Sequence, residues 1–301
     1  MIILGAGLAG TLAGALNQDA EIFEFGDNDT THQAVLRFRS PDIGEAVGIP
    51  FKKVTVYKNV WEHGHQPLSN KHIIDYSKKV SSIVSCRSIT DLDTVERWVA
   101  PADFHQQLKA QCEGRIQYNI KMDKEFVASC QLTLQPIIST IPLHILCDLL
   151  EMPIVSKFSD SQEIYVTRLL FPRCDVYMTN YYPGEHFYCY RASITGDNLI
   201  MESMDKIYQH AIDQVLASFG LSNLHYDTLV SNHRQERGKI RSIDESVRRR
   251  TVLTLTLEHG IFSLGRFATW RNILLDDVYK DIHVIKRLAN KDQYEIHRSL
   301  K

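Results

Sequence analysis

The 301-residue chain lacks closely spaced cysteine pairs, long uninterrupted apolar runs and low-complexity stretches. Its six cysteines are widely scattered, which excludes the spacings of zinc knuckles and redox motifs, so we expect no metal site. The longest apolar stretch, residues 136–150, contains two prolines and an aspartate and is too short to cross a bilayer. No export-signal pattern precedes the first glycines, and we therefore expect a cytoplasmic protein without membrane partners.

The chain also lacks a strong net charge. Its 34 basic and 36 acidic residues leave a formal charge of −2, so no global field draws the protein to nucleic acid. A local exception lies within residues 233–250, where basic residues outnumber acidic ones. Three interpretations of this run stay open: it contacts cofactor phosphates, it contacts a nucleic-acid backbone, or it is a solvated face. Its basic members are Arg234, Arg237, Lys239, Arg241, Arg248, Arg249 and Arg250.

Hydrophobic periodicity predicts mixed α and β structure. Residues 1–25 have the pattern of a strand, a tight turn, a helix and a second strand. Between residues 163 and 202 the period changes to two, which is typical of an antiparallel sheet. Further expected elements are strands at 137–140, 164–169, 175–179 and 187–191 and helices at 103–110, 143–150 and 203–219.

These patterns favour an α/β fold, α+β overall, in which a Rossmann-like domain carries an inserted antiparallel-sheet lobe. We expect residues 1–60, 95–150 and 235–301 to form the discontinuous nucleotide-binding domain. Residues 151–234 would form the substrate lobe, and residues 61–94 would connect the two parts.

A complete G-x-G-x-x-G motif follows the first apolar strand and opens the first expected helix, with the sequence Gly5, Ala6, Gly7, Leu8, Ala9 and Gly10. In such a motif the first glycine makes the turn, the second lets the backbone approach a pyrophosphate, and the third packs helix against strand. The amides of the first helical residues then bind the phosphates. The motif therefore predicts a dinucleotide site.

Glu24 ends the next expected strand, at the position where an acidic residue binds the ribose hydroxyls of a dinucleotide. Its carboxylate disfavours a 2′-phosphate, which argues against NADP. The motif alone does not separate FAD from NAD. A second glycine-rich motif for a nicotinamide nucleotide is absent, so any substrate is expected to meet a flavin directly.

The C-terminal part of the chain decides between these cofactors. Residues 260–264 read as a strand that ends in Gly265 and Arg266, followed by Thr269 and a helix-like run that contains Asp276 and Asp277. This pattern resembles the C-terminal flavin segment of the UDP-galactopyranose mutase and amine-oxidase group of FAD proteins. The resemblance implies that FAD is the cofactor and that Gly265 and Arg266 approach its flavin or its pyrophosphate. It also implies cofactor contacts for Thr269 and for Asp276 and Asp277, which occupy the acidic positions of a helix start beside the ribityl chain.

Arginines and tyrosines in two segments are candidates for substrate contacts. Arg37 and Arg39 are two residues apart, so on a strand they share one face and suit a carboxylate or a phosphate, although a surface pair fits equally well. Tyr182 and Arg191 belong to a tyrosine-rich part of the expected sheet, which would line a substrate face or supply core aromatics.

Residues 37–41, 48–51 and 265–272 resemble a compact group of bacteriophage-encoded FAD proteins. Some of these act as flavin-dependent lyases on amino acids attached to thymidine. The resemblance implies oxidative C–N cleavage of a small-molecule or modified-nucleotide substrate in a host cytoplasm. If DNA is the partner, it is either single-stranded or its modified base leaves the duplex. Two alternatives stay open, a sugar mutase that uses reduced flavin and a non-catalytic flavoprotein. The oligomeric state is not determined by the sequence.

Overall fold

The computed structural model describes residues 1–28, 32, 35–81, 89, 92–152, 161–172, 174–223, 228–241 and 243–290. The chain divides into two compact units. The first unit consists of Met1–Lys52, Trp98–Ser159 and Ile243–Lys301, and the second of Lys53–Arg97 and Asp160–Ser242.

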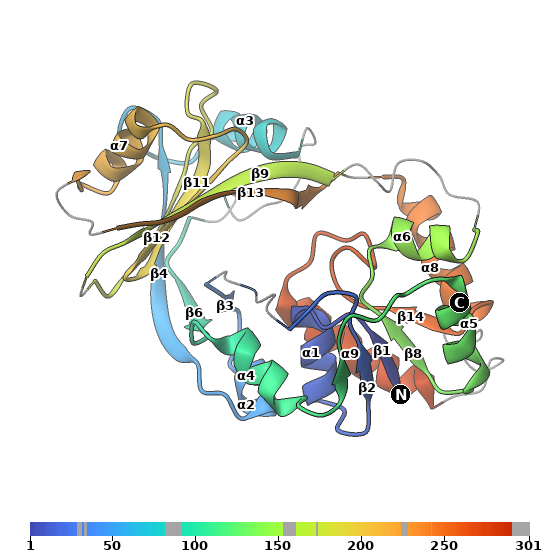
Figure 1. Cartoon of the computed structure of the whole chain (residues 1–301). Helices are drawn as coiled ribbons and strands as arrows, with labels where there is room; N and C mark the ends of the chain where they lie inside the picture. The colour runs from blue at the N-terminus through green and yellow to red at the C-terminus, as the bar shows by residue number, and fades with distance from the viewer. Residues whose placement is uncertain are drawn as a thin grey trace. The chain divides into compact units, whose positions relative to one another are not determined.

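A five-stranded parallel sheet forms the centre of the first unit, in the order β14-β8-β1-β2-β7 (Figure 1). Its central strand is apolar and fully enclosed, since Ile3 and Leu4 have no exposed surface. Such burial is typical of parallel strands covered on both faces. The strands are β1 (Ile2–Leu4), β2 (Glu21–Phe23), β7 (Ile116–Gln117), β8 (Ile137–Ser139) and β14 (Ile261–Ser263).

Helices cover this sheet, and Figure 1 shows α1 and α9 lying next to each other against it. α1 also contacts α4, and α8 contacts β14. The short strand β3 (Arg37–Phe38) pairs antiparallel with the end of β6 (Val95–Val99), which places Phe38 in the core beside Phe51 and Phe104. The helices are α1 (Leu8–Ala15), α2 (Asp42–Val47), α4 (Phe104–Gln111), α5 (Lys124–Leu132), α6 (Leu143–Leu149), α8 (Glu245–Leu257) and α9 (Leu275–Ala289).

The second unit is built on a mainly antiparallel sheet in the order β13-β9-β12-β11-β10-β4, with β5 paired to β4. β10 and β4 run parallel, so the sheet is mixed. Its strands are β4 (Lys52–Trp61), β5 (His65–Gln66), β9 (Ser161–Leu170), β10 (Val176–Tyr181), β11 (Cys189–Gly196), β12 (Asn198–Ser203) and β13 (Thr228–Ile240).

Successive side chains of β10 face different helices of the second unit, because side chains alternate along a strand. Asn180 hydrogen-bonds Ser218 at the end of α7 (Gln209–Ser218), whereas the ring of Tyr181 contacts Tyr76 on α3 (Asn70–Ser81). The ammonium group of Lys79 on α3 shares its three protons among four backbone carbonyls between residues 182 and 189, at 2.5–3.1 Å. Lys79 therefore fixes the connection from β10 to β11.

The expected fold class, an α/β fold with an additional antiparallel sheet, is confirmed. The structure differs from the sequence expectations in several details. Residues 53–60, 95–97 and 235–241, expected in the nucleotide-binding domain, belong to the second unit. Residues 61–94, expected to be a connection, contribute β5 and α3 to the second unit. The helix expected at residues 203–219 begins only at Gln209, since Ser203 ends the strand β12 and residues 204–208 connect that strand to α7.

Candidate functional site

The glycine loop between β1 and α1 has the strained geometry that its sequence predicts. Gly5 has a φ of +100°, a conformation that residues with a side chain rarely adopt. A Cβ atom on Gly10 would lie 1.8 Å from the carbonyl oxygen of Gly5, so only glycine allows the helix to start this close to the turn. These two glycines therefore serve the fold of the loop.

Gly7 serves a different purpose, because a Cβ atom at this position would have no neighbour within 4 Å. The first intrahelical hydrogen bond runs from the amide of Thr11 to the carbonyl of Gly7, at 2.9 Å. The amides of Leu8, Ala9 and Gly10 come before it, in the turn where a helix has no internal acceptors. The uncrowded backbone of Gly7 lets a pyrophosphate group approach, and the amides of the first helical turn would donate hydrogen bonds to it.

Glu24 follows β2, and its carboxylate hydrogen-bonds the backbone of the glycine loop. One carboxylate oxygen accepts a hydrogen bond from the amide of Ala6 at 2.5 Å, and the other accepts from the amide of Gly26 at 2.9 Å. A carboxylate has about four acceptor positions, so these two bonds leave capacity for the hydroxyls of a ribose. Glu24 is partly exposed, which keeps that capacity accessible.

His105, on the buried side of α4, was not predicted as a site residue. Its Nδ1 accepts a hydrogen bond from the amide of His32 at 2.9 Å, so the ring proton lies on Nε2, which donates to the carbonyl of Ala6 at 3.1 Å. Burial lowers the pKa of His105, which keeps the ring neutral. Both polar backbone groups of Ala6 are therefore held by side chains from other elements.

The segment after β14 returns to the glycine loop. Gly265 has a φ of +97°, and a Cβ atom there would lie 3.1 Å from the Cβ atom of Ala9 on α1. The amide of Leu264 donates to the carbonyl of Ser139 at the end of β8. The closeness of Gly265 to α1 agrees with a shared ligand site, and its contact with a flavin stays a prediction.

Two residues after Gly265 have structural partners in the same turn. The hydroxyl of Thr269 donates to the carbonyl of Gly265 at 2.7 Å, and the guanidinium of Arg266 donates to the side chain of Asn272 at 3.0 Å. Arg248 on α8 donates to the carbonyl of Thr269, and Arg271 donates to its hydroxyl. The turn is therefore braced from the side of α8, and the predicted cofactor roles of Arg266 and Thr269 stay predictions.

Arg39 lies against the start of α9. Its amide donates to Asp276 at 2.8 Å, and its guanidinium pairs with Asp277 at 2.9 Å. Asp277 also caps α9 by accepting from the amide of Leu274. The structure thus joins three residues that were predicted separately as substrate and cofactor contacts. Arg37 is half-buried in β3, and whether either arginine binds substrate stays a prediction.

In the second unit, Tyr182 lies in the core and has no exposed surface. Its hydroxyl hydrogen-bonds Ser218 on α7 at 2.6 Å, and burial raises its pKa. This position supports packing, so we leave Tyr182 out of the substrate contacts proposed below. Arg191 on β11 is about one third exposed and forms an ion pair with Glu202 on β12.

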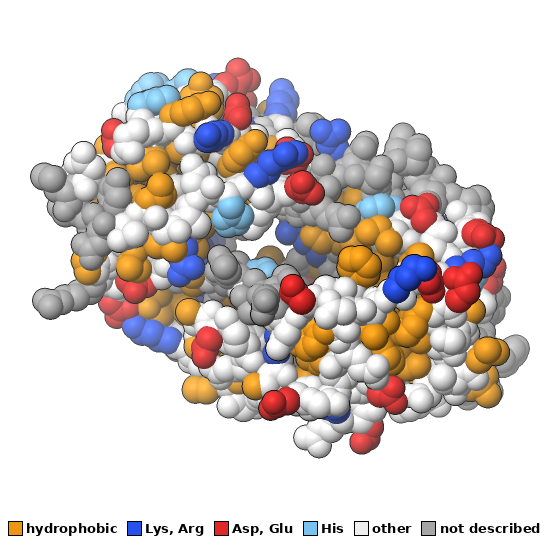
Figure 2. Space-filling view, in the orientation of Figure 1, with side chains coloured by type: hydrophobic (Ala, Val, Ile, Leu, Met, Phe, Trp, Pro, Cys, Tyr) orange, Lys and Arg blue, Asp and Glu red, His pale blue; other side chains and the backbone are white. Residues whose placement is uncertain are grey.

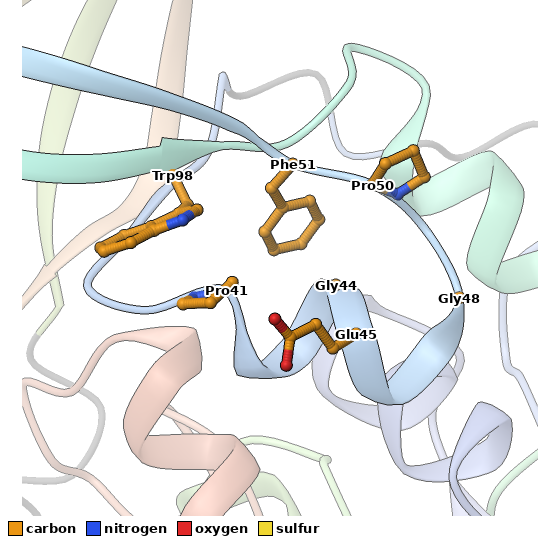
Figure 3. A pocket seen from close by; sticks show the side chains of 7 residues that line it. All are labelled: Pro41, Gly44, Glu45, Gly48, Pro50, Phe51 and Trp98. Carbon is orange, nitrogen blue, oxygen red and sulfur yellow. The ribbon is translucent and has the colours of Figure 1, made fainter.

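A cavity of about 460 Å³ lies beside α2 in the first unit, away from the glycine loop in the sequence. Figure 3 shows the rings of Phe51 and Trp98 on one side of it and the carboxylate of Glu45 on the other. Pro41, Gly44, Gly48 and Pro50 complete its lining. None of the predicted site residues lines this cavity, so we assign no role to it.

The basic run at residues 233–250 is divided between the units, and three of its seven basic residues form ion pairs with other described residues. Arg234 pairs with Glu163, and Arg248 and Arg249 both pair with Glu245. On the face shown in Figure 2, acidic and basic side chains lie intermingled. These pairs favour the solvated-face interpretation for the paired members of the run.

The five-stranded parallel sheet, its glycine loop and the second, mainly antiparallel sheet together define the fold of FAD-binding flavoproteins. Neither a protein-family model nor a curated protein sequence matches the chain. Among solved structures, it resembles reduced UDP-galactopyranose mutase with a TM-score of 0.61 and 14% identity, over 95% of this chain and 93% of that one.

Two further structures show the same fold. A triple mutant of putrescine oxidase, made in a redesign of cofactor binding, has a TM-score of 0.55 and 11% identity, with 96% of this chain and 97% of that one covered. A probable FAD-dependent monooxygenase from Pseudomonas aeruginosa has a TM-score of 0.53 and 10% identity, with 96% and 84% covered. Within the part of the chain that the structure describes, every helix is too short or too polar to traverse a bilayer.

Proposed function

We propose that this chain binds FAD without a covalent link and acts as an FAD-dependent oxidoreductase on a small-molecule substrate. The observation that carries the proposal is the open backbone at Gly7 beside the carboxylate of Glu24, in the fold of FAD-binding flavoproteins. The neighbours support the choice of FAD, since one of them is described as a probable FAD-dependent monooxygenase.

The residues of the first unit fit this cofactor. The amides of Leu8 and Ala9, with the open backbone of Gly7, would bind the pyrophosphate. Glu24 would accept from the ribose hydroxyls, and Gly265 and Arg266 would lie beside the flavin. When bound, FAD supplies an acceptor for a hydride, which carries two electrons.

For the substrate, we propose an amine or an amino-acid-like molecule whose anionic group is held by arginine. Arg37, Arg39 and Arg191 are the candidates, because a guanidinium binds a carboxylate through two parallel hydrogen bonds. Holding the carboxylate orients the carbon that loses hydride, and orientation contributes much of the rate in such reactions. Arg39 and Arg191 each have a carboxylate partner that the substrate would have to share or replace.

A finer proposal is oxidative C–N cleavage of an amino acid attached to thymidine in phage DNA, and it rests on the sequence resemblance alone. The attached amino acid would lose a hydride from its α-carbon and a proton from its nitrogen, which gives an imine. Water would hydrolyse the imine to an oxo acid and an aminomethyl base. Dioxygen would take up the two electrons and be reduced to hydrogen peroxide.

A sugar mutase that requires reduced flavin is the second candidate. It is favoured by one observation, the likeness to reduced UDP-galactopyranose mutase at a TM-score of 0.61 over almost the whole of both chains. A mutase turns over only after reduction of its cofactor and consumes no oxidant, so the two candidates differ in a measurable way.

The experiment has two stages. First, the absorbance spectrum of purified protein shows whether it carries FAD or takes it up when FAD is supplied; a colourless protein that binds none would refute both candidates. Second, the protein is mixed anaerobically with amines, amino acids and amino-acid-modified nucleosides, and bleaching of the flavin absorbance is followed. Air is then admitted and the release of hydrogen peroxide is measured. Bleaching supports the oxidoreductase. Turnover of a nucleotide sugar only after dithionite reduction supports the mutase. The absence of both results supports a non-catalytic flavoprotein.

A further inference from the structure

A second cavity of the first unit, about 370 Å³ in volume, lies between α8, β14 and α9. It is separate from the glycine loop, and none of its lining residues was assigned above to FAD contacts except Thr269. Its polar lining includes Arg248, Arg249, Ser263, Thr269, Arg271 and Asp281.

One side of this cavity is apolar. Val252 and Leu253 on α8 face Val284 and Leu288 on α9, and Phe262 lines the strand between them. Val284 is 41% exposed, and the other three helix side chains are only half-buried. The two helices thus leave apolar surface uncovered, which an apolar group of a ligand would bury with a gain of roughly 25 cal/mol per Å².

The other side is charged. Arg248 uses all three guanidinium nitrogens, two on Glu245 and one on the carbonyl of Thr269. Arg249 is different, since only its Nε hydrogen-bonds Glu245, at 2.9 Å, and its side chain is 71% exposed. Its two terminal nitrogens make no hydrogen bond to another residue within the described part of the chain. They are therefore available as donors.

Ser263 adds a buried donor to the same lining. It is 8% exposed, and its hydroxyl has no hydrogen-bond partner among the residues that the structure describes. Burying a hydroxyl without a partner costs about 1–3 kcal/mol, so such groups are uncommon unless a ligand or water completes them. The hydroxyl therefore indicates that something polar binds in this cavity.

The charges around the cavity do not balance. Arg248, Arg249 and Arg271 carry three positive charges, whereas Glu245 and Asp281 carry at most two negative ones. Burial raises the pKa of Asp281, and the charge of Arg271 opposes that rise. A single anionic group on a ligand would complete the balance.

We propose that this cavity binds a small amphipathic monoanion, a carboxylate with a short apolar body. The carboxylate accepts from the terminal nitrogens of Arg249 and from the hydroxyl of Ser263. The apolar body lies on the wall formed by Val252, Leu253, Val284 and Leu288.

Occupation of the cavity also bears on the turn after β14. Arg248 and Arg271 line the cavity and donate to the carbonyl and the hydroxyl of Thr269, which in turn donates to Gly265. A ligand that shifts either arginine therefore changes the support of Gly265. If the proposed FAD site is right, the bound flavin reports this shift through its absorbance or fluorescence.

Octanoate is a suitable probe, measured by titration calorimetry with FAD-free and FAD-loaded protein. We expect saturable binding of octanoate at millimolar concentration or below, and none of octylammonium, which has the opposite charge. Arg249→Gln should weaken octanoate binding about tenfold or more, because a charge-assisted bond is lost. Arg250→Gln is the matched control, since Arg250 neighbours Arg249 on α8 but does not line the cavity, and it should bind as the wild type does.

Two further variants separate binding from folding. Val284→Trp fills the mouth of the cavity and should abolish binding, whereas His283→Trp, at an exposed neighbour outside the lining, should not. Ser263→Ala should weaken binding without lowering the Tm, because the hydroxyl has no hydrogen bond to lose among the residues that the structure describes. The proposal would be overturned if the wild type binds no octanoate, or if Arg249→Gln and Val284→Trp bind octanoate with the affinity of the wild type. Since the FAD-free protein is tested too, this outcome is independent of the flavin proposal.

Discussion

The imidazole of His105 donates its Nε2 proton to the carbonyl of Ala6, 3.1 Å away, in the middle of the glycine loop. The amide of the same residue is held by Glu24. Ala6 therefore cannot rotate its peptide groups without breaking a bond to α4 or to the end of β2. This clamp keeps the neighbouring backbone of Gly7 presented to a ligand before the ligand arrives.

The clamp predicts a pH dependence of stability. Because burial lowers the pKa of His105 below 6.5, the unfolded chain binds this proton at a higher pH than the folded chain does. The contribution of His105 to stability is therefore complete above pH 6.5 and is lost as the pH falls below that value. Urea unfolding of wild type and His105→Gln across pH 5–8 measures it, and a difference between them that stays constant below pH 6.5 would contradict the clamp.

Adding a side chain at Gly7 should abolish FAD binding but spare the fold, whereas adding one at Gly10 should destabilise the fold. Gly7→Val adds a side chain where no protein atom lies within 4 Å, so the fold should survive while FAD binding is lost. Gly10→Ala places its Cβ atom 1.8 Å from the carbonyl of Gly5, so its Tm should fall by several degrees even without FAD. Thermal unfolding of the FAD-free proteins and flavin absorbance distinguish the two. Wild-type FAD content in Gly7→Val would place the cofactor elsewhere.

The ion pair between Arg39 and Asp277 allows the proposed substrate role of Arg39 to be tested against a purely structural one. The pair is partly exposed, so Arg39→Ala should cost only about 0.5 kcal/mol of stability. If Arg39 binds the substrate anion, anaerobic flavin reduction should slow about thirtyfold or more. Asp277→Asn breaks the pair but keeps an oxygen for the amide of Leu274, and it should slow reduction far less. Equal slowing in both variants would assign Arg39 to the ion pair alone.

Lys79 should be a major determinant of stability in the second unit. Lys79→Met removes the donor from four carbonyls of the connection between β10 and β11, and buried acceptors without partners are costly. We expect a loss of about 3 kcal/mol in the free energy of unfolding. Lys78→Met, at an exposed neighbour on the same helix, should change stability by less than about 0.5 kcal/mol. Similar losses in the two variants would show that the carbonyls find other donors.

Much of the fold was predictable because its signals are local. The glycine spacing, the apolar strand before it and Glu24 after it lie within the first 24 residues and specify one strand–turn–helix–strand unit. The helix at 104–111 and the strand at 137–139 were also predicted from short patterns. Residues 198–202 fell within the stretch predicted to be antiparallel sheet, but the separate strand Asn198–Ser203 was not distinguished, because its pairing with β9 and β11 sets its bounds.

The sequence by itself determined the kind of loop at the start of the chain, since only glycine satisfies its positive φ and its close contacts. Only the tertiary structure decided which groups meet around that loop. His105 reaches Ala6 across 99 residues, and Arg39 reaches Asp276 across 237. Hydrogen bonds between such distant residues depend on how the strands are ordered and how the helices pack on them, and a pattern of neighbouring residues contains neither.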